Sequence, residues 1–364
     1  MGFCSRLSIF LEPFEWRVEC VGLSRRQSLN KPDYVMTRVK IAGTGSYLPE
    51  RVVTNDELAE RLTKTSDEWI YTHTGIKSRH IAAPDESASS MGLIAAKRAM
   101  ENAGITAQDL GMIMVSTATP DYAPTPLTSC ILQDKLGATN AAAFDMSAAC
   151  CGFIYNMEIA KSFYFNPKYK RPMLLVATEV MTRKVDWNDH KTCILFGDGA
   201  GAAVLMPAED DEPSDIVDSV MKADGSCGQY LLLEGGCRSA DSLRHPLSHV
   251  LQMAGTQVFT FAIKAIEEVV TTLMKQNNLT FDDIARIIPH QANYRIIQAA
   301  GKRLGFENDD KFYINVKDVA NTASASIPIV LDEMNRNGEL KRGDKLIISG
   351  FGAGLTYGGN YIIW

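Results

Sequence analysis

Residues 141–164 read AAAFDMSAACCGFIYNMEIAKSFY, and this stretch indicates a strand that turns directly into a helix. The apolar residues of the helical part recur at helical spacing: Phe153, Met157, Ala160 and Tyr164. Cys150 lies at the junction, where the free N–H groups and the macrodipole of the helix are predicted to lower the pKa of the thiol and to favour the thiolate. Position alone does not separate Cys150 from Cys151, and a buried structural cysteine is the alternative.

Strand-like and helix-like segments alternate along the chain. The predicted strands are short apolar runs, namely Met112 to Val115, Leu174 to Ala177, Ile287 to Ile288 and Leu346 to Ile348. Stretches with helical periodicity cover Ser90 to Ala103 and Phe259 to Gln276. This alternation predicts an α/β protein in which helices cover sheets.

Two local patterns occur twice in the sequence. GITAQDL at 104–110 and NLTFDDI at 278–284 each precede a predicted strand, and GDGAG at 197–201 is echoed by GFGAG at 350–354, each followed by strand-like sequence. We therefore predict two copies of one unit, 36–208 with the cysteine and 209–364. The boundary is the acidic, proline-bounded stretch 207–213, for which a surface loop within a single unit is the alternative.

Residues 1–35 differ from the rest of the chain. They mix arginine with glutamate and show no sustained period, and their acidic residues argue against a transit peptide. Met36 directly precedes the strand-like segment 38–42. We expect the functional chain to start at Met36 and residues 1–35 to lie outside the fold.

The composition excludes several classes of protein. With 364 residues, 46% of them hydrophobic and 22% charged, the chain can bury a large core, and its net charge of −6 argues against nucleic-acid binding. The eight cysteines contain no CxxC spacing, which disfavours zinc and redox dithiol sites and indicates reduced thiols in the cytoplasm. No apolar run approaches the roughly 18 residues of a membrane span.

Two further side chains complete a reactive set with the cysteine. His290, in IIPHQAN at 287–293, ends a predicted strand just before a helix, and Asn321 lies in the small-residue segment VANTASAS at 319–326. A Claisen condensation needs a thiolate that carries an acyl group and neutral donors that stabilise the enolate formed by decarboxylation. The His290 Nε2–H and the Asn321 amide can be those donors. The N–H of Cys150 and the backbone of residues 352–354 are candidates for a second donor pair.

These residues resemble the β-ketoacyl-acyl-carrier-protein synthase III family of the thiolase superfamily, from Met36 to Trp364. Six motifs match in order: TSDEWI at 65–70, TGI at 74–76, AAC at 148–150, FGDGAGA at 196–202, PHQAN at 289–293 and NTAS at 321–324. The resemblance implies a duplicated thiolase-like fold, layered αβαβα with two mixed sheets, a homodimer, no cofactor and a ping-pong reaction. In that reaction acyl-CoA acylates Cys150, and malonyl-acyl-carrier protein is then decarboxylated and condensed to give the 3-oxoacyl product that initiates a fatty acid.

Matching positions imply further roles. Trp69 and Arg183 are expected to clamp the CoA adenine, and Asn293 to contact the pantetheine arm. Ala353 is expected to provide the second oxyanion N–H, and Phe351 to form part of a gate beside the sulfur.

The chain departs from the family pattern at three positions. His73 stands where many members have an arginine near the CoA phosphates, which lowers the expected affinity for the phosphates. Cys151 replaces an alanine or serine. Thr125 replaces a phenylalanine that closes the acyl pocket in some members, which favours primers longer or more branched than acetyl.

A basic helix face is predicted after the histidine. Arg295, Lys302 and Arg303 are spaced so that they share one face. We expect this face to dock the acidic carrier protein, and a solvated helix surface is the alternative.

Other functions fit parts of the pattern. The nearest is a related acyl-CoA condensing enzyme or acyltransferase of secondary metabolism. Hydroxymethylglutaryl-CoA synthases would need an acidic base near the sulfur, and elongating synthases pair cysteine with two histidines, so the Asn321 motif argues against both. A cysteine hydrolase would not need the WI…TGI region, and a non-catalytic binding homologue would not need all three reactive residues.

Overall fold

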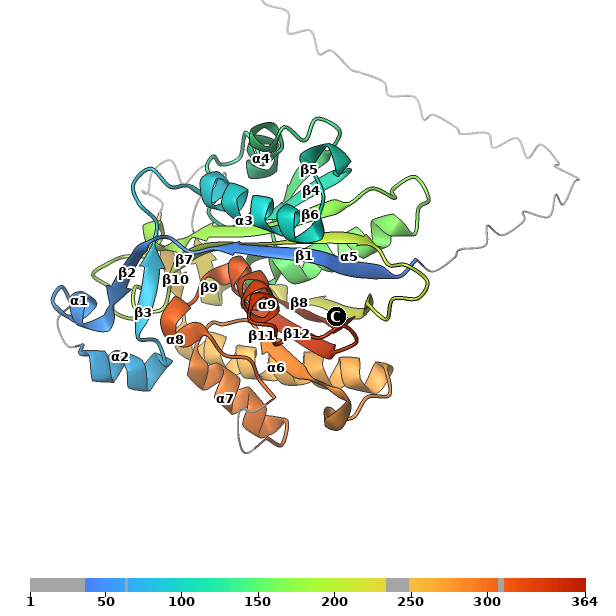
Figure 1. Cartoon of the computed structure of the whole chain (residues 1–364). Coiled ribbons are helices and arrows are strands. Elements are labelled where there is room, and N and C mark those ends of the chain that lie inside the picture. The colour runs from blue at the N-terminus through green and yellow to red at the C-terminus, as the bar shows by residue number, and fades with distance from the viewer. Residues whose placement is uncertain (1–36, 63–64, 234–248, 307–310) are drawn as a thin grey trace, which may run out of the picture. The chain divides into compact units, whose positions relative to one another are not determined.

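The computed structural model describes residues 37–62, 65–233, 249–306 and 311–364, so the expectation for residues 1–35 and Met36 falls outside the described residues. In these segments helices and sheets alternate in layers (Figure 1). The predicted α/β class and the αβαβα layering with two mixed sheets are confirmed.

The first sheet has five strands in the order β1-β7-β6-β4-β5. β4 runs parallel to β5 and β6, whereas β7 runs antiparallel to β1 and β6, so the sheet is mixed. Its strands are β1 (Val39–Tyr47), β4 (Met112–Ser116), β5 (Ala142–Met146), β6 (Met173–Val180) and β7 (Asp198–Pro207).

The second sheet has four strands in the order β11-β12-β13-β8, with only the β11–β12 pair parallel. Its strands are β8 (Asp215–Ala223), β11 (Arg286–Pro289), β12 (Lys345–Gly352) and β13 (Thr356–Ile363). Each predicted unit thus contributes one sheet. Residues Met36–Trp364 nevertheless form one compact unit, so the division at 208/209 stays a prediction.

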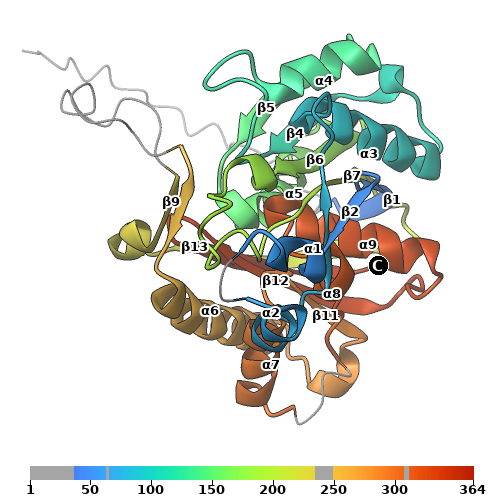
Figure 2. The same ribbon diagram turned by 90° about the vertical axis from the view of Figure 1, so that its left-hand side faces the viewer.

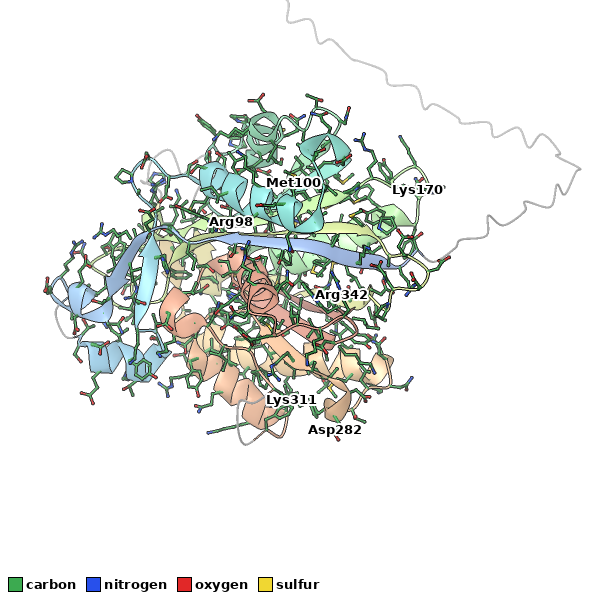
Figure 3. The ribbon with its side chains drawn as sticks, in the orientation of Figure 1. Arg98, Met100, Lys170, Asp282, Lys311 and Arg342 are labelled. Atoms are coloured by element: carbon green, nitrogen blue, oxygen red, sulfur yellow. The ribbon has the colours of Figure 1, made fainter. Side chains whose placement is uncertain are left out.

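Helices cover both outer faces and fill the space between the sheets. α3 (Ala88–Ala103) and α4 (Thr128–Leu136) pack on the outer face of the first sheet, and α6 (Gly255–Gln276) and α7 (Tyr294–Arg303) on that of the second. α5 (Gly152–Tyr164) and α9 (Ser326–Arg336) lie between the sheets and contribute to a core that both sheets share. Helix α3 has one face toward solvent and one toward the sheet. Arg98 is exposed and donates to Ser46 O, while Met100 packs in the core (Figure 3).

Shorter elements gather at one end of the layers (Figure 2). They include two small antiparallel two-stranded sheets and three helices, namely β2 (Arg51–Thr54), β3 (Ser78–Ile81), β9 (Leu231–Leu233), β10 (Leu251–Met253), α1 (Asn55–Ala59), α2 (Asp67–Thr74) and α8 (Val316–Val319). Short 3-10 turns complete the chain at η1 (Ala107–Asp109), η2 (Ala149–Cys151), η3 (Met181–Arg183), η4 (Gly225–Tyr230), η6 (Phe281–Asp283) and η7 (Ala323–Ala325).

The first repeated pattern has the same structure in both halves. In each, a helix ends, a 3-10 turn follows and a strand begins, and the turn is capped by a threonine and an aspartate three residues later: Thr106 with Asp109, and Thr280 with Asp283. The second repeat differs. Gly199 and Gly201 lie inside β7, where a Cβ on Gly201 would come within 2.8 Å of Pro328 in α9, whereas Gly352–Gly354 leads into the β12–β13 turn.

Candidate active site

Cys150, the predicted nucleophile, lies in a tight turn between β5 and α5, as expected from the sequence. η2 connects them, and Ala149 adopts the left-handed φ of 46° that the turn requires. A Cβ on Gly152 would lie 1.6 Å from Ser116 Oγ, so only glycine allows the helix to start this close to β4.

The two adjacent cysteines face different surroundings. Cys150 lines a cavity of about 380 Å³. Cys151 is fully buried and its thiol donates to Thr356 O at 3.5 Å, on β13. The structure therefore separates the two thiols that position in the sequence could not separate, and it leaves Cys150 accessible to a ligand.

His290 follows the last residue of β11 and is 1% exposed. Its Nδ1 lies 2.7 Å from Ser326 Oγ, the first residue of α9, and Ser326 Oγ also accepts from the Gln291 N–H at 3.4 Å. The Ser326 hydroxyl can donate to Nδ1, and in that tautomer the ring proton is on Nε2, so that Nε2–H is a donor.

Asn321 is held by its backbone and by its side-chain oxygen. Its N–H donates to Leu195 O and its C=O accepts from the Gly197 N–H, which joins the segment after α8 to the chain that enters β7. Its Oδ1 accepts from the Ala323 N–H at 2.9 Å. Because the oxygen is engaged, the side-chain NH₂ is the group that Asn321 can offer to a ligand.

One cavity brings the three predicted catalytic residues together. Cys150, His290 and Asn321 all line it, and most of the remaining wall is apolar, with Leu231, Met253, Val258, Phe259 and Ile296 among the lining residues. An acyl or pantetheine chain fits such a wall, while the few polar groups fix its orientation.

Burial keeps both reactive groups neutral. Burial raises the pKa of the Cys150 thiol well above its usual value, and the negative charge of Glu179 adds to this effect. Burial lowers the pKa of His290 to about 3. The prediction that the helix start makes Cys150 a thiolate is therefore wrong for the ligand-free site, because loss of hydration outweighs the favourable backbone groups.

Backbone groups converge on the nucleophile from β12. A Cβ on Gly352 would come within 2.6 Å of the Cys150 N atom, so the β12 end and the nucleophile turn touch through backbone. Gly352 and Phe351 line the cavity, and the Phe351 ring lies 5.4 Å from the His290 ring, centroid to centroid. Ala353 comes next in the chain. Its role as second oxyanion donor and the role of Phe351 as a gate stay predictions.

The two residues expected to clamp an adenine line different cavities. Trp69 lines the cavity of Cys150, with its ring stacked on His73 at 4.2 Å. Arg183 lines a neighbouring cavity, and its guanidinium donates to Ala83 O at 2.7 Å, so the clamp formed with Trp69 stays a prediction. The His190 ring lies 6.0 Å from that of Trp69 in an edge-on arrangement.

His190 and Lys191 were missed by the sequence analysis, although both line the cavity. Two adjacent basic residues directly before the apolar run 193–196 were the signal that could have found them. Asn293 lines the same cavity and also caps α7, since its side-chain oxygen accepts from the Arg295 N–H.

The remaining predicted residues lie outside the cavity. Arg295, Lys302 and Arg303 are exposed on α7, and Arg303 forms an ion pair with Glu267 of α6 at 2.7 Å. Thr125 is exposed and does not line the cavity of this chain.

Among the described residues no group of three or more His, Cys, Asp and Glu side chains could hold a metal ion. Within the same residues, none of the helices has the length and apolar character needed to cross a membrane.

Comparisons with known proteins agree with this geometry. Residues 144–225 match the family model 3-oxoacyl-[acyl-carrier-protein (ACP)] synthase III, and residues 274–364 match the model of its C-terminal part. A β-ketoacyl-[acyl-carrier-protein] synthase III from Clostridium beijerinckii is 45% identical over 90% of this chain and 100% of its own length. One from Caldanaerobacter subterraneus is 46% identical over 89% of this chain and 97% of its own length.

Solved structures are similar over the same region. A 3-oxoacyl-[acyl-carrier-protein] synthase III from Aquifex aeolicus VF5 has a TM-score of 0.83 and 39% identity, covering 90% of this chain and 100% of that chain. The priming β-ketosynthase from the R1128 polyketide biosynthetic pathway has a TM-score of 0.83 and 35% identity, covering 90% and 97%.

Proposed function

The chain belongs to the β-ketoacyl-acyl-carrier-protein synthase III family, and we propose that Cys150, His290 and Asn321 carry out its reaction. It is an acyltransferase that initiates fatty acid synthesis by decarboxylative condensation of an acyl-CoA primer with malonyl-acyl-carrier protein. The observation that carries the assignment of residues is the single apolar cavity lined by a thiol, a neutral imidazole and a carboxamide.

In the first half-reaction the Cys150 sulfur attacks the thioester carbonyl of acyl-CoA. His290 Nε2 takes the thiol proton, which requires the tautomer with the hydrogen on Nδ1, and the Ser326 hydroxyl can accept from that position as readily as it can donate to it. The carbonyl oxygen gains charge near the Cys150 N–H and the Ala353 N–H. Collapse expels CoA, which leaves with the proton, and Cys150 carries the acyl group.

In the second half-reaction malonyl-acyl-carrier protein loses CO₂, and the electron pair of the broken bond forms an enolate. The His290 Nε2–H and the Asn321 NH₂ donate to the enolate oxygen, because both are neutral donors held from behind by Ser326 and by the Ala323 N–H. The carbanion attacks the carbonyl carbon of the acyl group on Cys150. The Cys150 sulfur leaves as a thiolate and then recovers a proton.

The cavity mouth fits the CoA thioester. Trp69 and His190 present rings that an adenine can stack on, Lys191 supplies a positive charge for a phosphate, and Asn293 lies along the path of the pantetheine arm. Arg183, whose guanidinium donates to Ala83 O, stays the second residue proposed to contact the adenine.

Three tests follow from this assignment. Radiolabelled acyl-CoA should label the wild type and Cys151→Ala but not Cys150→Ala, and label on another cysteine would contradict the nucleophile. Product analysis with malonyl-carrier protein should give a 3-oxoacyl thioester, whereas free acid would indicate a hydrolase. Charge reversal at Arg295 and Lys302 should raise KM for malonyl-carrier protein and leave KM for acyl-CoA unchanged.

A homodimer is the proposed assembly, and the cytoplasm the proposed compartment. β5 is an edge strand of the first sheet in the described part of the chain, so its outer backbone groups can pair with another copy. Tyr122, in the loop between β4 and α4, is 56% exposed. Analytical ultracentrifugation tests the assembly.

A related condensing enzyme of secondary metabolism is the second candidate. The similarity to the R1128 priming β-ketosynthase favours it. Initial rates with acetyl, isobutyryl, butyryl and longer CoA primers discriminate, because a clear preference for a primer unsuited to fatty acids would support this candidate. The same series tests whether this chain, which has Thr125 where some family members have phenylalanine, prefers primers longer or more branched than acetyl.

A further inference from the structure

A carboxylate that the reaction scheme does not use lies buried beside the nucleophile. Glu179, near the end of β6, has no exposed surface. One oxygen accepts from Ser324 Oγ at 2.5 Å, and the other from Thr119 Oγ1 at 2.8 Å and from the Ala118 N–H at 3.0 Å.

These partners are arranged to donate. Thr119 Oγ1 already accepts from the Val180 N–H at 2.8 Å, so its hydrogen points to Glu179, and a backbone N–H can only donate. Hydrogen bonds of this kind favour the ionised carboxylate, whereas burial opposes it and raises the pKa of Glu179 to about 7. The protein thus holds an anion, or a proton that is readily lost, in its interior.

Ser324 occupies the same place in the second half as Cys150 does in the first. Both follow an alanine with a left-handed φ, 46° at Ala149 and 47° at Ala323, and both lie in a 3-10 turn that runs into a central helix. The second turn starts two residues after Asn321, whose Oδ1 is bound to the Ala323 N–H. Glu179 therefore reaches the turn that orients the Asn321 amide.

Glu179 also acts on the nucleophile through its charge. After burial, it is the largest of the effects that raise the pKa of the Cys150 thiol. We propose that Glu179 is a positioning residue of this active site: its carboxylate holds the turn that carries Asn321 and places a negative charge next to the adjoining Cys150 turn. This inference rests on the roles proposed for Cys150 and Asn321.

The other titratable groups near Glu179 do not replace it in this role. The largest effects on its own pKa are burial and the hydrogen bonds from Ser324, Thr119 and Ala118. Asp198 on β7 pairs with Val180, one residue further along β6, so strand alternation places its side chain on the opposite face of the sheet. His290, held by the start of α9, is neutral because burial lowers its pKa to about 3. Glu179 is thus the anionic side chain whose charge acts on the Cys150 thiol.

Two variants separate the two effects. Glu179→Gln removes the charge, and iodoacetamide should then alkylate Cys150 about tenfold faster at neutral pH, because loss of a nearby like charge favours the thiolate. Ser324→Ala keeps the carboxyl group of Glu179 and removes one contact to the turn, and it is compared with wild type at a pH well above 7, where that carboxyl is ionised in both proteins. It should leave alkylation within about twofold of wild type while decarboxylation of malonyl-carrier protein falls about tenfold, the usual effect of one lost hydrogen bond to a charged group.

Asp198→Asn is the matched control. Asp198 is also fully buried and accepts from the Ala82 N–H and from Thr182, but it is not among the causes of the Cys150 shift. Its variant should be less stable, with an unchanged alkylation profile across pH. Where Glu179→Gln fails to fold, Glu179→Asp takes its place, with alkylation expected as in wild type and decarboxylation lowered.

The outcomes distinguish this inference from the proposed function. Alkylation of folded Glu179→Gln at the wild-type rate, or decarboxylation by Ser324→Ala at the wild-type rate, overturns the inference alone. If Glu179→Asp is used, decarboxylation at the wild-type rate would likewise overturn the inference alone. Peptide mapping that placed the label on a cysteine other than Cys150 would instead overturn the proposed nucleophile.

Discussion

The neutral state of His290 can be tested through stability, independently of activity. Burial lowers the pKa of this imidazole from 6.5 to about 3, and unfolding restores its ordinary value. Between these limits the unfolded chain binds more protons than the folded protein. The contribution of His290 to stability is therefore fully present above pH 6.5 and is lost as the pH falls. With 1.36 kcal/mol per pH unit, acidification from about pH 7.5 to about pH 5 should cost about 2 kcal/mol at this residue.

Glu179 changes the stability in the opposite direction over the same pH range. Its pKa is raised from 4.5 to about 7 by burial, so its contribution is fully present below pH 4.5 and is lost as the pH rises through 7. The same acidification should raise the contribution of Glu179 to the free energy of unfolding by about 3 kcal/mol. The two contributions nearly cancel in the wild type, and each becomes visible when the other is removed.

Urea unfolding of His290→Gln at the two pH values measures the first contribution. On acidification this variant should gain about 2 kcal/mol relative to wild type, because it no longer has an imidazole to protonate on unfolding. Parallel pH dependences for His290→Gln and wild type would refute the desolvated, neutral imidazole on which the donor role depends.

Three other outcomes follow from the geometry. Cys151→Ala should keep acyl-enzyme formation within a few-fold of wild type, measured with radiolabelled acyl-CoA, because its thiol faces Thr356 O; a loss as large as in Cys150→Ala would contradict this. Gly352→Ala should slow acylation about 100-fold in single-turnover assays, since its Cβ would come within 2.6 Å of Cys150 N and displace an oxyanion donor; a normal rate would show that the donor lies elsewhere. Ser326→Ala should lower decarboxylation about tenfold with little change in KM, because His290 Nδ1 loses its partner; an effect on KM alone would argue against that.

The elements and the reactive residues were accessible from the sequence because they depend on local patterns. Runs such as Met112–Val115 and the helical period of 259–276 correspond to β4 and to α6, with boundaries shifted by a few residues at most. The repeated T-x-x-D patterns became equivalent capped turns, since a threonine and an aspartate at this spacing satisfy the same backbone groups in both halves.

The protonation state of Cys150 and the path of the loops could not be predicted from local sequence patterns. The state of the Cys150 thiol depends on burial and on Glu179, which lies 29 residues further along the chain and reaches the site only through the pairing of β6 with β4. The sequence also did not indicate that Arg183 and Trp69 line different cavities, because the turn at η3 directs Arg183 to Ala83 O and the chain returns to the Trp69 cavity only at 190.

The position of α9 between the sheets bears on how the chain acquires its structure during synthesis. α9 comes from the last tenth of the sequence, yet Asp332 binds Thr44 and Ser46 on β1, and the α9 apolar face packs in the core with β1 and β7. The first sheet cannot bury its inner face until residue 336 has left the ribosome. Folding of the nascent N-terminal half ahead of the rest is thereby disfavoured. Despite their similar architecture, the two halves should unfold in one cooperative transition.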